Sequence, residues 1–260
     1  MAHWPVWSKP IVQSIGRYRY IAATGLPPAI RAGTIVAFAG DGSRVDFKSG
    51  TEPGRSNRLE LARLLQPLQL TWLSLQHGTD VVLPGQDDGN KADAALITQP
   101  GLAVAFTTAD CLPIIIGGDD AVLAIHAGWR GIADGIIEHA LAVMASTPSP
   151  FRLTPPSHLK VFIGPSIDQA HYEIDNLTRQ RLLSRPALAD NPEEFFEPVR
   201  EGHWLADLTG MAVAILINQG LDIRNIEVSG LSTFIETNLH SARRDGEASG
   251  RMATFVAWAE

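Results

Sequence analysis

Five short apolar segments between residues 71 and 125 most constrain how this chain can fold. They are nearly continuous in Ala, Val, Ile and Leu, and turn-forming Gly and Asp residues separate several of them. A strand with one face in water alternates polar and apolar residues, and these segments do not. They therefore predict strands that are covered on both faces. The segments are Thr71–Leu75, Ala94–Thr98, Leu102–Thr107, Leu112–Ile116 and Ala121–Ile125.

Helical patterns accompany these strands and predict a fold of the α/β (α+β) class. Residues 57–65 predict a helix with Asn57 as its N-cap, Glu60 completing a capping box and Pro67 beyond its end. Residues 132–144 carry apolar side chains at helical spacing. Further helices are expected at 176–183 and 206–219, strands at 33–40, 159–163, 226–228 and 253–258, and loops at 49–56 and 241–251.

Length and composition predict one large domain over residues 1–260, in which 1–30 is the less certain, N-terminal part. The net charge of -7 argues against non-specific binding of nucleic acid. One cysteine cannot form an internal disulfide, and no segment approaches the roughly 20 apolar residues of a membrane span. The first ten residues lack an apolar core of signal-peptide length. We expect a cytoplasmic protein without membrane or nucleic-acid partners; its oligomeric state stays open.

The single cysteine, Cys111, lies between His77 and His126, and all three follow apolar segments where strands give way to turns. One thiolate and two imidazoles suit zinc, and three protein ligands leave a fourth position for water or substrate. Gly78 and Gly128 follow the histidines closely and leave room beside the backbone. Spacing alone does not settle the matter, because a buried free cysteine and two turn histidines are an ordinary alternative.

Several short motifs resemble those of one protein family, variously called polyphenol oxidase or laccase domain, peptidoglycan editing factor and purine nucleoside phosphorylase. The similarity runs from about Gly33 to the C-terminus. The three core motifs are Gln76-His77-Gly78, Ala109-Asp110-Cys111-Leu112-Pro113 and His126-Ala127-Gly128-Trp129-Arg130-Gly131. The other matches are Asn57-Arg58, Ala92-Asp93-Ala94, Ile163-Gly164-Pro165 with Tyr172-Glu173, and Ser241 through Arg251.

The resemblance implies a layered α/β/β/α domain with mixed sheets, related in fold to a cysteine-dependent toxin deamidase. It implies zinc held by His77, Cys111 and His126. It also implies phosphorolysis of the purine nucleosides adenosine and inosine, cleavage of 5′-methylthioadenosine, and deamination of adenosine at one site. The chain departs from the family at Ser166 and Ser232, where many members carry cysteine.

The chemistry of these reactions suggests roles for further residues. Familiar zinc deaminases use a Glu in a His-x-Glu motif. Neither His77 nor His126 begins such a motif, so Asp110 is the candidate proton carrier. A role of Asp110 in orienting a ligand or capping a turn is an equal alternative. A phosphate dianion needs guanidinium donors, and Tyr172 is either a wall for the base or a core residue. The candidate catalytic residues are His77, Asp110, Cys111 and His126, and the candidate substrate and phosphate residues are Asn57, Arg58, Gln76, Arg130, Tyr172, Arg243 and Arg244.

Three alternatives stay open at this point. Cys111 could act as the nucleophile of a hydrolase that edits peptidoglycan precursors, with His77 or His126 as its base. Copper oxidation of phenols is less favoured, because laccase chemistry needs several coppers and the chain has no His-x-His pair. A purely structural zinc would usually close with four protein ligands, and no fourth ligand stands out in the sequence.

Overall fold

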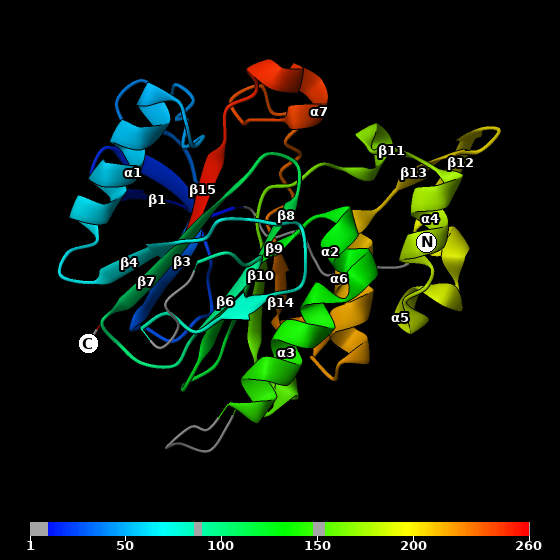
Figure 1. The fold of residues 1–260 in the computed structure, drawn as a ribbon, viewed down its shortest axis with the longest axis horizontal. Helices are drawn as coiled ribbons and strands as arrows, with labels where there is room; N and C mark the ends of the chain where they lie inside the picture. Colours follow the sequence, from blue (N-terminus) through cyan, green and yellow to red (C-terminus); the bar gives the residue numbers. More distant parts are fainter. Residues whose placement is uncertain (1–9, 86–89, 148–153, 260) are drawn as a thin grey trace.

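Two large sheets lie face to face in the computed structural model, which describes residues 10–85, 90–147 and 154–259. Helices cover the outer face of each sheet, so the described chain forms four layers in the order helix, sheet, sheet, helix (Figure 1). This arrangement confirms the predicted α/β class with mixed sheets. A relation to the toxin deamidase fold stays a prediction.

The first sheet has six strands, and helix α1 (Glu52–Leu64) packs on its outer face. Neighbouring strands are antiparallel except β4 and β7, which are parallel. In spatial order the strands are β1 (Val12–Ile15), β2 (Tyr18–Ala22), β3 (Ile30–Phe38), β15 (Met252–Trp258), β7 (Leu102–Thr108) and β4 (Gln69–Trp72).

The second sheet also has six strands, with a parallel pair at each edge and antiparallel pairs between them. Helices α3 (Ile136–Ser146) and α6 (Leu208–Asn218) pack on its outer face. In spatial order its strands are β14 (Ile226–Val228), β10 (Lys160–Ile163), β8 (Leu112–Gly117), β9 (Val122–Ala127), β6 (Ala94–Ile97) and β5 (Val81–Val82).

A smaller antiparallel sheet stands beside these layers, to the right of α6 in Figure 1. Its strands are β11 (Glu173–Asp175), β13 (His203–Ala206) and β12 (Phe196–Arg200), and helices α4 (Asn176–Leu182) and α5 (Pro186–Ala189) accompany them. The remaining helices are α2 (Trp129–Asp134) and α7 (Ala242–Asp245), and short 3-10 turns lie at Pro156–His158, Gln169–His171, Pro192–Glu194, Ile223–Asn225 and Gly246–Ala248.

Strand β7 shows why the central segments read as apolar throughout. Ala103 and Ala105 face the core under α1, whereas Val104 and Phe106 face the core between the two sheets. Successive side chains of a strand point to opposite faces, so a strand with both faces covered must be apolar at every position. The expectation of strands covered on both faces is confirmed for β6, β7, β8 and β9. It is wrong for Thr71–Leu75, because only Thr71 and Trp72 belong to a strand, β4, and this edge strand is partly exposed.

The start of α1 differs from the prediction. The helix begins at Glu52, and Thr51 caps it by accepting a hydrogen bond from the Gly54 N–H at 3.1 Å. The predicted loop over 49–56 and the predicted Asn57 cap are therefore wrong. Pro53 and Gly54 read as loop residues, yet proline is tolerated in the first turn of a helix. A Cβ atom at Gly54 would lie 1.9 Å from the Lys48 carbonyl oxygen, so the close packing here requires glycine.

The structure differs from the prediction at a break in one helix and at a short helix within an expected loop. The helix expected over 132–144 is split into α2 and α3 at Gly135, which adopts a left-handed φ of 92°. The loop expected over 241–251 contains α7. Within the uncertain segment 1–30, β1 and β2 form one edge of the first sheet, while residues 1–9 lie outside the described residues. Among the described helices, none is both long and apolar enough to cross a bilayer.

Replacing Phe255 by Ala should destabilise the fold strongly. Phe255 is fully buried on β15, and its ring meets Tyr20 edge-on with the centroids 5.1 Å apart. Loss of a buried ring leaves a cavity, so we expect the free energy of unfolding to fall by about 3–5 kcal/mol. Urea denaturation measures this, with Leu59→Ala on exposed α1 surface as the control. A change for Phe255→Ala as small as that of the control would contradict this packing.

Candidate metal centre and its surroundings

The three predicted ligands come together at one end of the second sheet. Cys111 immediately precedes β8 and His126 lies on β9, and these strands pair with Pro113 opposite His126. His77 arrives from the segment that follows β4. One side-chain ligand atom from each of His77, Cys111 and His126 lies within 4.8 Å of the others. The hairpin therefore sets two ligands, and the third comes from a separate loop.

A buried carboxylate, Asp93, holds the loop that carries His77. Its oxygens accept the backbone N–H groups of Gln76, His77 and Gly78 at 3.0, 2.9 and 2.9 Å. His77 has a φ of 57°, which is uncommon for a residue with a side chain. The three hydrogen bonds to one carboxylate stabilise this strained loop conformation and direct His77 toward the other ligands.

The same carboxylate also orients His126. Asp93 Oδ1 lies 2.8 Å from His126 Nδ1, and both side chains are buried. With Nδ1–H donating to the carboxylate, Nε2 stays free to bind a metal, an arrangement common around histidine ligands of zinc. Burial opposes ionisation of Asp93, but the hydrogen bonds from His126 and the backbone lower its pKa overall. The sequence reasoning gave Asp93 no role, although Ala92-Asp93-Ala94 puts an acid at the start of an apolar strand.

Charge couples Cys111 to His126. Burial disfavours the thiolate, yet the positive charge of His126 and hydrogen bonds from both histidines lower the pKa of Cys111 to about 6. Burial likewise disfavours the His126 cation, but the Cys111 thiolate and Asp93 raise the pKa of His126 to about 9. Without a metal, the two side chains thus favour a thiolate–imidazolium pair near neutral pH.

These residues fit a zinc ion. The donor set of one sulfur and two nitrogens is a zinc set, and the bond from His126 to Asp93 is the outer support such a site usually has. Gly128 leaves space at the centre, because a Cβ atom there would lie 3.0 Å from Cys111 Sγ. A single copper ion also accepts two histidines and a cysteine. The geometry therefore supports a metal without fixing its identity.

A cavity of about 470 Å³ opens beside this centre. His77, Cys111 and His126 line it together with Arg58. The Arg58 guanidinium lies 4.3 Å from the ring centre of Trp72, and its Nε donates to the Phe47 carbonyl at 2.9 Å. The other lining residues are Ser49, Trp72, Leu73, Ser74, Leu75, Asn90, Thr107, Thr108, Ala109, Ala242 and Arg251.

A second hollow, of about 500 Å³, holds two other predicted substrate residues. Tyr172 and Arg243 line it, with the Arg243 guanidinium 5.0 Å from the Tyr172 ring centre. Burial is the main cause that raises the pKa of Tyr172, so its hydroxyl stays protonated. Trp129, Glu173, Asp175 and His203 complete most of this wall. Of the predicted substrate residues, Arg58 therefore lines the first hollow, and Tyr172 and Arg243 line the second.

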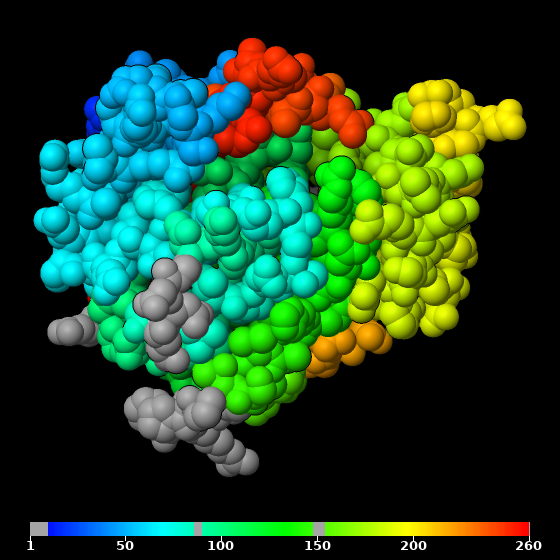
Figure 2. Space-filling model, in the orientation of Figure 1, coloured from blue at the N-terminus to red at the C-terminus, as the bar shows by residue number. Residues whose placement is uncertain are grey.

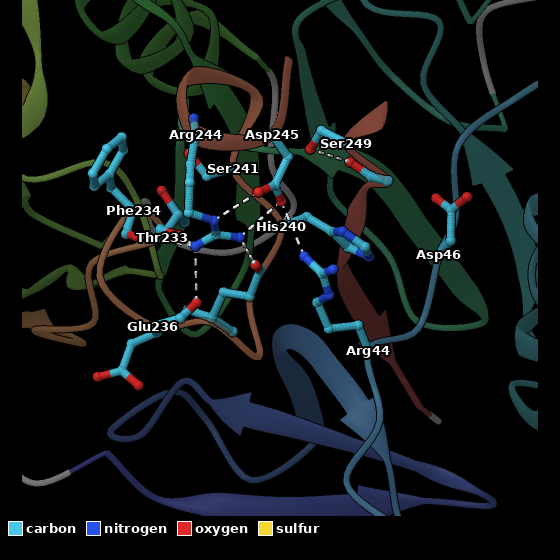
Figure 3. Close-up of polar contacts among 12 residues, drawn as sticks. Arg44, Asp46, Thr233, Phe234, Glu236, His240, Ser241, Arg244, Asp245 and Ser249 are labelled. Carbon is cyan, nitrogen blue, oxygen red and sulfur yellow. Dashed lines mark hydrogen bonds and ion pairs between the residues drawn. The ribbon is translucent and has the colours of Figure 1, made fainter. Parts of the chain in front are cut away.

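Arg244 is fully engaged within the protein. Its guanidinium donates to the backbone carbonyls of Thr233, Phe234, Glu236 and Leu239 and pairs with Asp245 at 2.7 Å (Figure 3). Asp245 in turn binds Arg44 at 3.0 Å. This network fastens the segment around α7 to its neighbours, which gives Arg244 a structural task.

The side chains of three other predicted substrate residues also have partners nearby. Asn57 accepts from the Tyr18 hydroxyl and donates to the Asp46 carbonyl, at 2.9 and 2.8 Å. Arg130 is exposed and lies over its neighbour Trp129, 4.6 Å from the ring centre. The third residue, Gln76, donates to the carbonyls of Ser74 and Leu75. A substrate role for these residues stays a prediction.

Asp110 joins distant segments of the chain. It has a φ of 90°, and its two oxygens accept the Thr233 hydroxyl at 2.6 Å and the Arg243 N–H at 2.7 Å. A carboxylate with both oxygens engaged in this way anchors its neighbours. The geometry favours a role of Asp110 in orienting its neighbours over a role as proton carrier. Kinetic measurements on an Asp110 variant would distinguish the two roles.

Comparison with known protein families shows to which one the chain belongs. The family described as multi-copper polyphenol oxidoreductase laccase matches residues 47–259. The chain belongs to this family. Its resemblance at the three core motifs is thereby confirmed. The laccase-family name itself does not identify the metal at the His77, Cys111 and His126 centre.

Relatives in sequence and in structure carry different names. A purine nucleoside phosphorylase from Xylella fastidiosa is 32% identical over 210 residues, covering 76% of each chain. The purine nucleoside phosphorylase YfiH of Escherichia coli strain K12 is 30% identical and spans 73% of this chain and 74% of that protein. The crystal structure of YlmD from Geobacillus stearothermophilus has a TM-score of 0.80 at 25% identity, over 98% of this chain and 100% of that one. Neisseria meningitidis protein NMB0706 gives 0.78 at 25% identity, over 94% and 100%.

Replacing Asp93 by Asn should weaken metal binding, which zinc can probe. An amide oxygen carries no full charge, and its NH₂ group cannot accept the remaining backbone N–H groups. Loss of such a partner behind a metal ligand typically lowers metal affinity by about 10- to 100-fold. Competition with a chromophoric chelator measures the affinity, and Asp190→Asn on the surface is the matched control. Equal metal affinity of the two variants would show that Asp93 does not support the centre.

Proposed function

We propose that the protein is a zinc-dependent purine nucleoside phosphorylase that acts on adenosine, inosine and 5′-methylthioadenosine and also deaminates adenosine. The observation that carries this proposal is the cluster of His77, Cys111 and His126, which opens into a cavity containing arginine. Relatives about 30% identical that are named purine nucleoside phosphorylase support the reaction class.

Each residue of the centre has a distinct task in this proposal. His77, Cys111 and His126 would hold the zinc ion, and Asp93 keeps both histidines in place. When bound, zinc supplies a Lewis acid at the floor of the cavity. Asp110 positions Arg243 through the backbone, and Tyr172 offers its ring as a wall for the base. Arg58 presents positive charge to the phosphate.

The proposed phosphorolysis exchanges one bond at the sugar. A phosphate oxygen forms a bond to the anomeric carbon as the bond from that carbon to the purine nitrogen breaks. The electron pair of the broken bond stays on the purine, which takes up a proton and leaves, and ribose 1-phosphate is the other product. In the proposed deamination, water replaces the amine on the purine ring and ammonia leaves.

The setting of this activity is also part of the proposal. Its substrates are small molecules, and we expect neither nucleic acid nor a membrane as partner. A cytoplasmic location stays a prediction. Copper oxidation of phenols is disfavoured, because the described residues contain one such His/Cys group whereas oxygen reduction by laccases uses several coppers.

A cysteine hydrolase that edits peptidoglycan precursors is the second candidate. Two contacts favour this candidate. The Cys111 thiol interacts with the His126 ring, and Asp93 orients that ring from its other side. A nucleophile, a base and an orienting carboxylate are the parts of a hydrolytic triad. Zinc and an electrophilic substrate would compete for the same sulfur, so the two candidates exclude each other at one centre.

Adenosine turnover with and without phosphate tests the first candidate. Purified protein with about one zinc per chain should form adenine and ribose 1-phosphate only when phosphate is present, and inosine without it. Cys111→Ala should lose both zinc and turnover, because the only thiolate ligand is removed. The control is His158→Ala, which alters an exposed histidine. Full activity of Cys111→Ala would contradict the metal mechanism.

Removal of the metal separates the two candidates. Dialysis against a chelator should abolish nucleoside turnover, and added zinc should restore it. A hydrolase that uses the free thiolate would instead keep or gain activity on amide substrates after chelation. Its thiolate would then be blocked by iodoacetamide. Product analysis by liquid chromatography before and after chelation provides the readout.

A further inference from the structure

We propose that Arg58 and Arg251 together form the anion subsite that holds phosphate above the metal centre. This inference rests on the proposed function and assigns its second substrate to two named side chains. The two arginines come from distant parts of the chain, the first from α1 and the second from the residue before β15. Both line the cavity into which the three metal ligands open.

Arg58 is fixed in orientation, and the described acid that attracts it, Asp46, lies beyond ion-pair distance. Its Nε donates to the Phe47 carbonyl at 2.9 Å, and its plane rests against Trp72. Within the described residues, no carboxylate forms an ion pair with it. A preoriented guanidinium with free N–H groups is suited to binding phosphate.

Arg251 is held in the same manner. Its Nη1 donates to the carbonyls of Ser249 and Gly250 at 3.1 and 2.8 Å. Asp46 is the nearby acid, but its Oδ1 accepts the backbone N–H groups of Arg251 and Lys48 at 2.8 Å each. No ion pair neutralises the Arg251 guanidinium in the part of the chain described. Uncompensated positive charge at a cavity wall attracts an anion.

The two hollows differ in charge, and this difference locates the phosphate. Among the described residues that line the metal cavity there is no Asp or Glu. The second hollow contains Glu173 and Asp175 beside Arg243. A phosphate dianion would be repelled by these carboxylates, so the metal cavity is the favoured place. Arg244 is already occupied by backbone carbonyls and Asp245.

A buried hydroxyl adds an independent observation. Thr108 lines the metal cavity, is 2% exposed, and its Oγ1 has no hydrogen-bond partner. Buried hydroxyls are normally paired, so an unpaired one at a cavity wall points to a missing ligand. A phosphate oxygen between Arg58 and Arg251 would offer the acceptor that Thr108 lacks.

Arg58→Gln and Arg251→Gln test this subsite. Each should raise the KM for phosphate at least about tenfold, since hydrogen bonds to charged groups are strong, and change the KM for adenosine less than about twofold. Arg251→Lys keeps the charge but loses the forked geometry, so an intermediate KM is expected. Arg55→Gln is the matched control, because Arg55 lies on the same helix and is exposed next to Glu52. Thermal unfolding shows whether each variant is folded.

Binding of inorganic phosphate without nucleoside separates this inference from the proposed function. Calorimetry of the zinc-loaded protein should show binding that both Gln variants weaken and Arg55→Gln leaves unchanged. Such binding supports the subsite even if no nucleoside turns over. Phosphorolysis with an unchanged phosphate KM in the folded Arg58→Gln and Arg251→Gln variants would overturn it while leaving the function intact. Weakening by Arg243→Gln alone would place the anion in the second hollow and also overturn it.

Discussion

The carboxylate of Asp93 is the interaction on which the centre depends most. A buried charge is costly unless it is paired and hydrogen-bonded. Here the backbone N–H groups of three consecutive residues and the ring of His126 satisfy it. The bonds bring together a loop after β4 and a strand of the other sheet, β9. Without this charge the His77 loop would lose its three backbone anchors at once.

The layered fold explains why the strain near the centre is tolerated. His77 and Asp110 both have positive φ values, which residues with side chains seldom adopt. Asp110 lies between the buried strands β7 and β8, and both residues are held by hydrogen bonds that involve a carboxylate. Rigid sheets thus support backbone conformations that would relax in a free loop. In Figure 2 the red-orange segment around α7 lies between the blue α1 region and the yellow-green region around β11.

Local sequence patterns predicted those features that depend on neighbouring residues, namely strands, helices and strand ends. The buried strands, helices α4 and α6 and the grouping of His77, Cys111 and His126 were expected, because apolar periodicity and strand ends can be read along the chain. Contacts between distant segments could not be read in this way. Asp93 gained its role only when His77 and His126 were placed around it. Arg243 and Arg244 are neighbours in sequence, yet one lines a hollow and the other binds backbone carbonyls. Arg251 was part of a motif but had no assigned task until the cavity was known.

The pairing of β8 with β9 has a consequence for how this centre can vary. Cys111 and His126 sit at one end of the hairpin, and its turn at Gly118 to Asp120 lies at the opposite end. Leu123 and Ile125 face the helices while Val122 and Ala124 face the first sheet, so His126 belongs to the inter-sheet side. A residue inserted at the turn would lengthen the hairpin tip and leave the centre unchanged. A residue inserted within β9 would turn the imidazole toward α3. Homologues that keep this centre can therefore differ in length at the tip of the hairpin but not within β9.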